Sequence, residues 1–127
     1  IWVVEDCGKV INPMLVDEQI RGGVVQGIGS ALFEECIYDE DAQLRNGTLA
    51  DYLVPMAGEM PDIKIAHVET PTLVTELGAK GCGEAGIISI CAAIMNGIND
   101  ALEPLGDVSL TSQPFTPEKI LKAIGKI

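Results

Sequence analysis

Positive charge is scarce in this chain of 127 residues. Lysines and arginines together number 8, against 19 aspartates and glutamates, so the formal net charge is −11 and the isoelectric point lies near 4.2. The phosphates of nucleic acids and anionic membrane surfaces both repel such a chain. We therefore expect neither nucleic acid nor a membrane among its partners, whereas a small-molecule substrate remains open.

Cysteine and histidine are few, and they form none of the usual patterns. The four cysteines contain no CxxC pair and no spacing typical of a metal site, which favours reduced thiols in a cytoplasmic protein. The single histidine, His67, stands beside Glu69 in a strand-like segment, where a hydrogen-bonded structural role is more common than catalysis. The cysteines are Cys7, Cys36, Cys82 and Cys91.

A targeting segment and a long apolar run are also missing. No basic segment followed by an apolar run is visible at the start, so no signal peptide is predicted. The apolar run over residues 85–95 is too short to span a bilayer, which predicts a buried helix in a soluble protein. The chain has no initiator Met and opens on IWVVED, which has the composition of a strand already in progress. We therefore expect the chain to be one piece of a longer polypeptide and to hold only part of a functional site.

The pattern of apolar residues predicts a single compact α+β, or mixed α/β, fragment over residues 1–127. Strands are predicted at 1–6 and 62–70, with a short one near 108–110. Residues 36–49 are predicted to form a hairpin with an acidic turn at 39–41. Helices are predicted at 15–36, at 85–102 and from Pro117 onward, with Thr116 as the last N-cap.

The first predicted helix, over residues 15–36, contains several glycines. Asn12-Pro13 is interpreted as a break before it, and Asp17 and Glu18 are expected in its first turns, where the helix dipole favours acids. Each glycine costs roughly 1 kcal/mol relative to alanine in a helix interior. Small residues on one face let another backbone approach closely, so we predict a close packing partner. The glycines are Gly22, Gly23, Gly27 and Gly29.

A second glycine cluster, LGAKGCGEAGII at residues 77–88, surrounds the single carboxylate of Glu84. Glycine loses more conformational freedom on folding than any other residue, so the cluster implies positive φ angles or a close approach. Its GCGEAG formally fits the dinucleotide pattern GxGxxG. However, the preceding ELGAK is a poor strand, and the acid at the required distance, Glu103, ends a helix. We interpret the match as accidental.

The residues alone leave two explanations for Glu84 open. A glutamate in the first turn of a helix is stabilised by the dipole by ~0.3–1 kcal/mol, which is a purely structural role. Alternatively, Glu84 is the only charge between Lys80 and Asp100, and facing a pocket there it would have the raised pKa of a general base. A helix N-terminus would also lower the pKa of Cys82, but no histidine partner lies nearby in the sequence.

Several segments, taken in order, resemble one family. Together they are similar to the C-terminal part of the molybdenum-binding large subunit of the xanthine dehydrogenase family, which includes aldehyde oxidases and aerobic carbon monoxide dehydrogenases. The resemblance covers essentially the whole chain. The segments are VEDCGKVINP, DEQIRGGVVQGIGSALFEE, NGTLADYLVPMAGEMPDI, HVETPT, LGAKGCGEAG and TPEKILKAI.

The resemblance implies roles for five residues, four of which lie in the glycine cluster. Glu84 would be the base that activates a molybdenum-bound hydroxide, for hydroxylation of an aldehyde, an N-heterocycle or a related substrate, or for CO oxidation. Gln19 would hydrogen-bond the cofactor, and the backbone of Gly81, Cys82 and Gly83 would pack against its molybdenum end. The dithiolene of the cofactor supplies the metal's ligands, so none is expected from the protein.

The resemblance also implies cofactors and partners. The cofactor would be molybdopterin, in its cytosine dinucleotide form, with 2Fe-2S and FAD groups on partner subunits or domains. The rest of the large subunit would adjoin this chain, and the enzyme would be cytoplasmic. The alternative is a non-catalytic folding or interaction module derived from that family. The residues that select the substrate, and the copper-binding cysteine of the CO branch, would lie in other parts of the large subunit.

Overall fold

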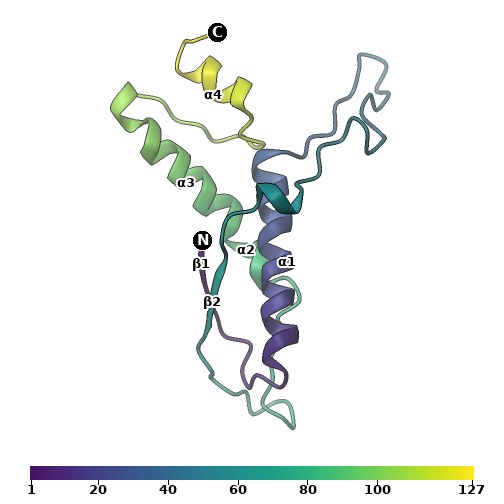
Figure 1. The fold of residues 1–127 in the computed structure, drawn as a ribbon, viewed down its shortest axis with the longest axis vertical. Helices are drawn as coiled ribbons and strands as arrows, with labels where there is room; N and C mark the ends of the chain where they lie inside the picture. Colours follow the sequence, from purple (N-terminus) through teal and green to yellow (C-terminus); the bar gives the residue numbers. More distant parts are fainter.

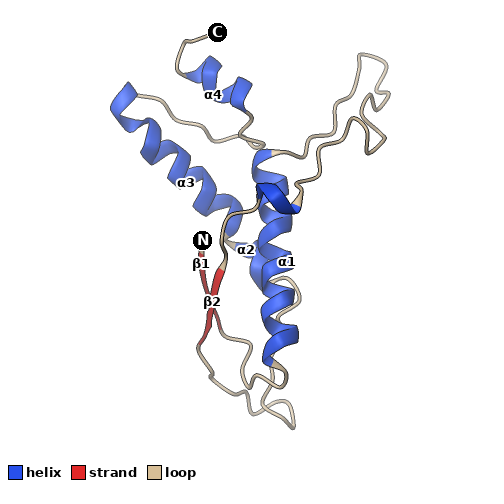
Figure 2. Cartoon of the chain, viewed as in Figure 1, coloured by secondary structure: helices blue, strands red, loops and turns tan.

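A computed structural model describes all residues, 1–127, and its fold is α+β, as predicted (Figure 2). The helix α1 forms the long axis, and a short two-stranded sheet lies beside its lower half (Figure 1). The elements are β1 (Trp2–Glu5), α1 (Pro13–Leu32), β2 (Lys64–His67), α2 (Ala85–Ile88), α3 (Ile90–Leu102) and α4 (Pro117–Ala123), with short 3-10 turns at Ala57–Glu59 and Glu103–Leu105.

The two strands are parallel, and α1 lies in the connection between them. The register places Trp2 opposite Lys64 and Glu5 opposite His67. Both longer predicted strands are therefore confirmed. The third, near residues 108–110, is wrong, because no strand forms there. Instead the Asn99 side chain satisfies the backbone of Leu110, accepting from its N–H at 2.8 Å and donating to its carbonyl at 2.9 Å.

The start of α1 differs from the prediction by two residues. Asn12 is its N-cap and accepts a hydrogen bond from the Leu15 N–H at 3.3 Å, and Pro13 takes the first helical position. Proline is suited to this position because the first N–H groups of a helix have no intrahelical partner. Asn12-Pro13 therefore begins the helix rather than separating it from the strand. Consequently no acid lies in the first turn, and Asp17 and Glu18 come later.

The core forms where α1 meets the strands and α3. Three buried residues of α1 pack with Ile63, which precedes β2, and with Ile90 of α3. Because these apolar side chains recur at helical spacing, one face of α1 carries most of the core. The buried cluster consists of Ile20, Val24, Ile28, Ile63 and Ile90.

The glycines of α1 provide the predicted close approach, and the partner is this chain's own helix pair α2–α3. A Cβ at Gly23 would lie 2.9 Å from the Gly86 Cα, and a Cβ at Gly27 would lie 1.5 Å from Ile90 Cγ2. A Cβ at Gly86 would lie 2.3 Å from the Ile20 carbonyl oxygen. Side chains larger than hydrogen are therefore excluded at this crossing. Gly22, by contrast, faces open space.

The helix predicted at residues 85–102 has the expected ends, but it breaks at Ser89 into α2 and α3. Its predicted burial is wrong, since only Gly86, Ile90 and Leu102 are buried. The reason is visible in Figure 1, where α3 diverges from α1. By length and composition alone, the 21 residues of Ala85–Leu105 could cross a membrane, and 17% of their most apolar window is buried.

The remaining loops and α4 largely follow the sequence pattern. Residues 36–49 turn at the predicted acidic run, although a single bridge between Tyr38 and Leu44 replaces a strand ladder. The Asp39 carboxylate closes this turn by accepting from the Gln43 N–H at 2.9 Å. The helix α4 begins as predicted, with the Thr116 hydroxyl oxygen accepting from the Lys119 N–H at 3.3 Å.

Adjacent glycines of α1 give a matched test of this packing. We expect Gly23→Ala to lower the free energy of unfolding, because overpacking costs about 1–3 kcal/mol and the new methyl group would meet the backbone of α2. Gly22→Ala should instead raise stability by roughly 0.5–1 kcal/mol, the gain in helix propensity. Urea unfolding of the native chain and the two variants measures both changes in the free energy of unfolding. Equal effects of the two substitutions would contradict the observed packing.

Candidate functional site

The glycine-rich loop lies just before α2 and lines a concavity with a volume of about 390 Å³. The loop, the residues of α2 that follow it and the end of β1 all contribute to its lining. All four residues predicted for the cofactor and the base in this loop lie here. The lining residues are Glu5, Gly81, Cys82, Gly83, Glu84, Ala85 and Ile88.

A direct hydrogen bond joins α1 to this loop. The Gln19 side-chain Nε2 donates to the Gly83 carbonyl oxygen at 2.7 Å, across 64 residues of sequence. Gln19 lies one turn before Gly23, where α1 and α2 are closest. The structure therefore brings together the two segments to which the family resemblance gives cofactor roles.

Nothing within this chain requires glycine at two positions of the loop, Gly81 and Gly83. A Cβ at Gly81 or at Gly83 would meet no atom within 4 Å, and neither residue has a positive φ. Gly78, by contrast, has a φ of +72° and needs glycine for its turn. The backbone at Gly81 and Gly83 is therefore open for close approach by a group outside the chain.

Glu84 is the N-cap of α2, with φ −113° and ψ 4°, and its side chain makes no capping hydrogen bond. The carboxylate is exposed and lines the concavity. Sequence reasoning placed it at the start of this helix, which the structure confirms to within a residue. The apolar enclosure predicted around it is not formed by this chain alone.

Glu5 was missed in the sequence analysis. It ends β1, is partly buried, and lines the same concavity as Glu84. An antiparallel bridge between Gly8 and Ala79 brings the segment after β1 beside the loop. No local sequence signal indicates this pairing, because it depends on two segments that are far apart in the chain.

The cysteines and the histidine offer no nucleophile pair. Cys82 is partly exposed in the concavity, while Cys7 is buried, and all cysteines are free. Burial, and secondarily the nearby Cys82, raise the pKa of the Cys7 thiol. The His67 Nε2 lies 2.6 Å from the Asp17 Oδ1, so this histidine is hydrogen-bonded between β2 and α1, as the sequence favoured. Its Nδ1 is buried without a partner.

The Asp6 carboxylate is the most densely hydrogen-bonded acid near the loop. Its Oδ1 accepts from the N–H of Gly8 at 2.9 Å and of Thr70 at 3.1 Å. Its Oδ2 accepts from the Thr70 hydroxyl and from the Lys80 ammonium, the latter at 3.1 Å. The Thr70 hydroxyl, followed by the backbone N–H groups and Lys80, holds the pKa of Asp6 well below its usual range.

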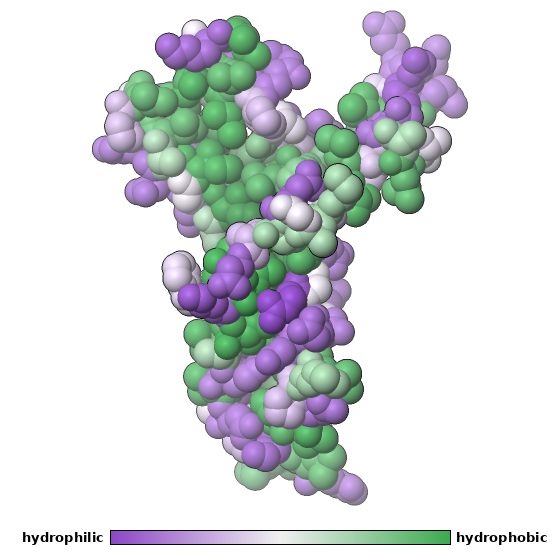
Figure 3. Space-filling view, viewed as in Figure 1, coloured by the Kyte–Doolittle hydropathy of each residue, from purple (hydrophilic) through white to green (hydrophobic).

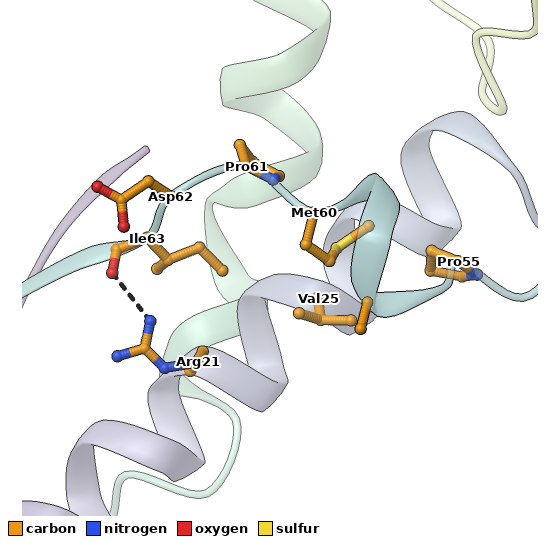
Figure 4. Close-up of a pocket in the computed structure, with 8 residues that line it drawn as sticks. Arg21, Val25, Pro55, Met60, Pro61, Asp62 and Ile63 are labelled. Carbon is orange, nitrogen blue, oxygen red and sulfur yellow. Dashed lines mark hydrogen bonds between the residues drawn. The ribbon is translucent and has the colours of Figure 1, made fainter.

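A second concavity, of about 420 Å³, lies between α1 and residues 55–63 and was not predicted (Figure 4). The Arg21 guanidinium donates to the Ile63 carbonyl oxygen at 3.0 Å and closes one side. Val25, Met60 and Ile63 contribute apolar surface. Neither concavity brings together three or more His, Cys, Asp or Glu side chains able to hold a metal ion.

Acid should destabilise the fold through Asp6. Because its folded-state pKa is lowered, the stabilisation is complete above the ordinary aspartate pKa of about 4 and is lost as the pH falls below it. We expect Asp6→Asn to be less stable than the native chain at pH 7, with the difference shrinking between about pH 5 and pH 2. Urea unfolding of both proteins across this range measures it. A stability difference between the two proteins that does not change with pH would contradict the lowered pKa of Asp6.

Comparison with known sequences gives a consistent result. The profile of a molybdopterin cofactor-binding domain matches residues 1–61. The nicotine 6-hydroxylase large subunit of Paenarthrobacter nicotinovorans is 50% identical over 123 residues, which is 97% of this chain and 15% of that protein. The xanthine dehydrogenase molybdenum-binding subunit of Escherichia coli O157:H7 is 37% identical over 118 residues, 92% of this chain and 15% of that protein.

Comparison with solved structures agrees with the sequence comparison over almost the whole chain. Quinoline 2-oxidoreductase from Pseudomonas putida 86 superposes with a TM-score of 0.93 at 49% identity, over 98% of this chain and 16% of that one. A Cu,Mo-CO dehydrogenase superposes with a TM-score of 0.84 at 28% identity, over 98% of this chain and 16% of that one. The chain thus spans about 15% of the length of the curated relatives it matches.

Proposed function

This chain belongs to the molybdenum-binding large subunits of the xanthine dehydrogenase family, and from that premise we propose that it presents Glu84 as the general base of a molybdenum hydroxylase. The observation that carries the proposal is the hydrogen bond from Gln19 to the Gly83 carbonyl oxygen. It joins the two segments assigned to one cofactor and fixes the residue next to Glu84. The acid–base chemistry proposed for Glu84 typically contributes 10²- to 10⁴-fold to a rate.

The residues around the concavity fit the molybdopterin cofactor. The open backbone at Gly81 and Gly83 permits close approach of a large planar group, with Cys82 between them. Gln19 would hold this group from α1. When bound, the cofactor supplies the two-electron redox chemistry. On the family resemblance, we assign it the cytosine dinucleotide form, with 2Fe-2S and FAD groups on partner subunits or domains that carry the electrons away.

Within the concavity, the role proposed for this chain's own residues is proton transfer. Glu84 lines the concavity as the N-cap of α2, and its carboxylate makes no capping hydrogen bond, so its oxygens are available to accept a proton. In the complete site, the rest of the large subunit would exclude water from this carboxylate.

Exposed apolar surface supports packing against the rest of a large subunit. The chain has 8605 Å² of solvent-accessible surface, whereas a compact protein of 13.4 kDa has roughly 6,500 Å². Trp2 and Ile88 are 81% and 79% exposed, on the sheet and on α2. Green apolar surface also gathers between α3 and the upper part of α1 (Figure 3). We infer that the other parts of the subunit cover these surfaces and that α3 lies inside the folded enzyme.

The substrate class proposed is an N-heteroaromatic compound. Two similar proteins near 50% identity, a nicotine hydroxylase subunit and a quinoline oxidoreductase, have names that refer to such rings. The CO dehydrogenase structure is 28% identical. Sequence similarity therefore favours ring hydroxylation over CO oxidation. A non-catalytic module of the same family is the second candidate, and the exposure of Glu84 in this chain is the observation that favours it.

Replacing the proposed base tests both candidates. In the holoenzyme that contains this segment, we expect Glu84→Gln to lower kcat by about 10²- to 10⁴-fold, because an amide cannot accept the proton. Molybdenum content should be almost unchanged, since Gln19 and the loop backbone remain. Metal analysis and steady-state kinetics with an N-heterocyclic substrate measure both quantities.

Glu76→Gln is the matched control. Glu76 is also exposed and precedes the same loop, but it does not line the concavity. We expect this variant to keep native turnover. Full molybdenum loading together with near-native turnover in Glu84→Gln would reject the general-base role and favour the non-catalytic module.

A further inference from the structure

The loop that carries Glu84 is attached to the segment after β1 by backbone pairing. The Lys9 N–H donates to the Gly78 carbonyl oxygen at 3.0 Å, and the Lys80 N–H donates to the Cys7 carbonyl oxygen at 2.7 Å. The backbone of residues 78–80 is therefore paired antiparallel with that of residues 7–9. The pairing ends at Lys80, only four residues before Glu84.

Side chains reinforce this attachment at the same point. The Lys80 Nζ donates to the Thr70 hydroxyl oxygen at 2.6 Å and to the Asp6 Oδ2 at 3.1 Å. Asp6 in turn accepts from the Thr70 hydroxyl and from two backbone N–H groups. These three residues, Asp6, Thr70 and Lys80, form what we call the Asp6 clasp. It joins three segments that are remote in sequence.

The opposite end of the same loop is held by α1. There the Gln19 side chain binds the Gly83 carbonyl oxygen. Between the two attachments lie only Gly81 and Cys82, and both line the concavity. Since Glu84 directly follows Gly83, its backbone position depends on both ends. Removing either attachment leaves a glycine-rich stretch with little conformational restriction of its own.

We propose that Asp6 is a positioning residue for Glu84, acting through Lys80 and Thr70. Asp6 does not itself line the concavity. Its role is to hold the loop at a fixed register against residues 7–9, the segment after β1. The catalytic part of this inference rests on the proposed function of Glu84, whereas the attachment of the loop does not.

Asp6→Asn is a suitable probe because it preserves shape while breaking the clasp. Asparagine has one acceptor oxygen, and its NH₂ group would face donors such as the Lys80 ammonium or the Thr70 hydroxyl. The matched control is Asp51→Asn. Asp51 lies in an exposed loop and bonds only locally, with its Oδ2 3.1 Å from the Thr48 hydroxyl.

The first measurement is hydrogen–deuterium exchange of the holoenzyme. We expect backbone amides of residues 78–84 to exchange at least about tenfold faster in Asp6→Asn than in the native enzyme, and to be unchanged in Asp51→Asn. Lys80→Arg, which retains the charge and the donors, should restore slow exchange relative to Lys80→Met. Native exchange of residues 78–84 in Asp6→Asn would overturn the proposal, whatever the activity.

The second measurement is kinetic. We expect Asp6→Asn to lower kcat by about 10- to 100-fold, the effect of displacing a catalytic group by about 1 Å, with KM changed less than about threefold and molybdenum retained. On a Glu84→Gln background the same substitution should cause no further loss, because it acts through the missing carboxylate. If the two substitutions instead lower kcat independently, so that their effects multiply in the double variant, the proposal that Asp6 acts through Glu84 is overturned.

These results separate the two hypotheses. If Glu84→Gln turns over normally, the proposed function fails, and the exchange rates alone decide whether the Asp6 clasp holds the loop. If Glu84→Gln is inactive and Asp6→Asn has native exchange and native kcat, the proposed function stands and the positioning role is rejected.

Discussion

The contact between α1 and α2 is the constraint on which the rest of this structure depends. Hydrogen atoms in place of side chains at Gly23 and Gly86 let the two backbones meet with a separation that no methyl group would permit. Gln19 lies one turn away on the same helix, which is why its amide reaches the Gly83 carbonyl oxygen. A larger side chain at the crossing would therefore disturb packing and the site together. Stability and site geometry share one cause here.

The candidate site combines fixed and open backbone within a few residues. Gly78 and Lys80 are paired with the segment after β1, and Gly83 is held from α1. A Cβ at Gly81, between these points, would meet no atom within 4 Å. An arrangement of this kind can accept a large planar ligand against the backbone without losing the position of the adjacent carboxylate. The lining combines two carboxylates, Glu5 and Glu84, with the apolar side chains of Ala85 and Ile88 at the start and end of α2.

Sequence reasoning found the elements whose signals are local. The N-cap of α4, the strand at β2 and the start of α2 each follow from short patterns of turn residues, β-branched residues and glycine. It failed where a distant side chain replaces backbone pairing, as Asn99 does for Leu110. It also missed Glu5, because that residue reaches the concavity only through the pairing of Gly8 with Ala79. Burial of α3 was overestimated because a periodic apolar helix does not reveal which molecule covers it.

The parallel pairing of β1 with β2 has a consequence for assembly. Trp2 and Lys64 are neighbours in the sheet although a complete helix and a long loop separate them in the chain. Contacts of such high sequence separation are slow to form, because the entropy of closing the intervening chain must be overcome first. The hydrogen bonds of Asp6 to Thr70 and Lys80 join residues with similarly large separations in the sequence, 64 and 74 positions. The concavity is lined by Glu5 at the end of β1 and by the glycine-rich loop, so its shape depends on closing this long stretch of chain.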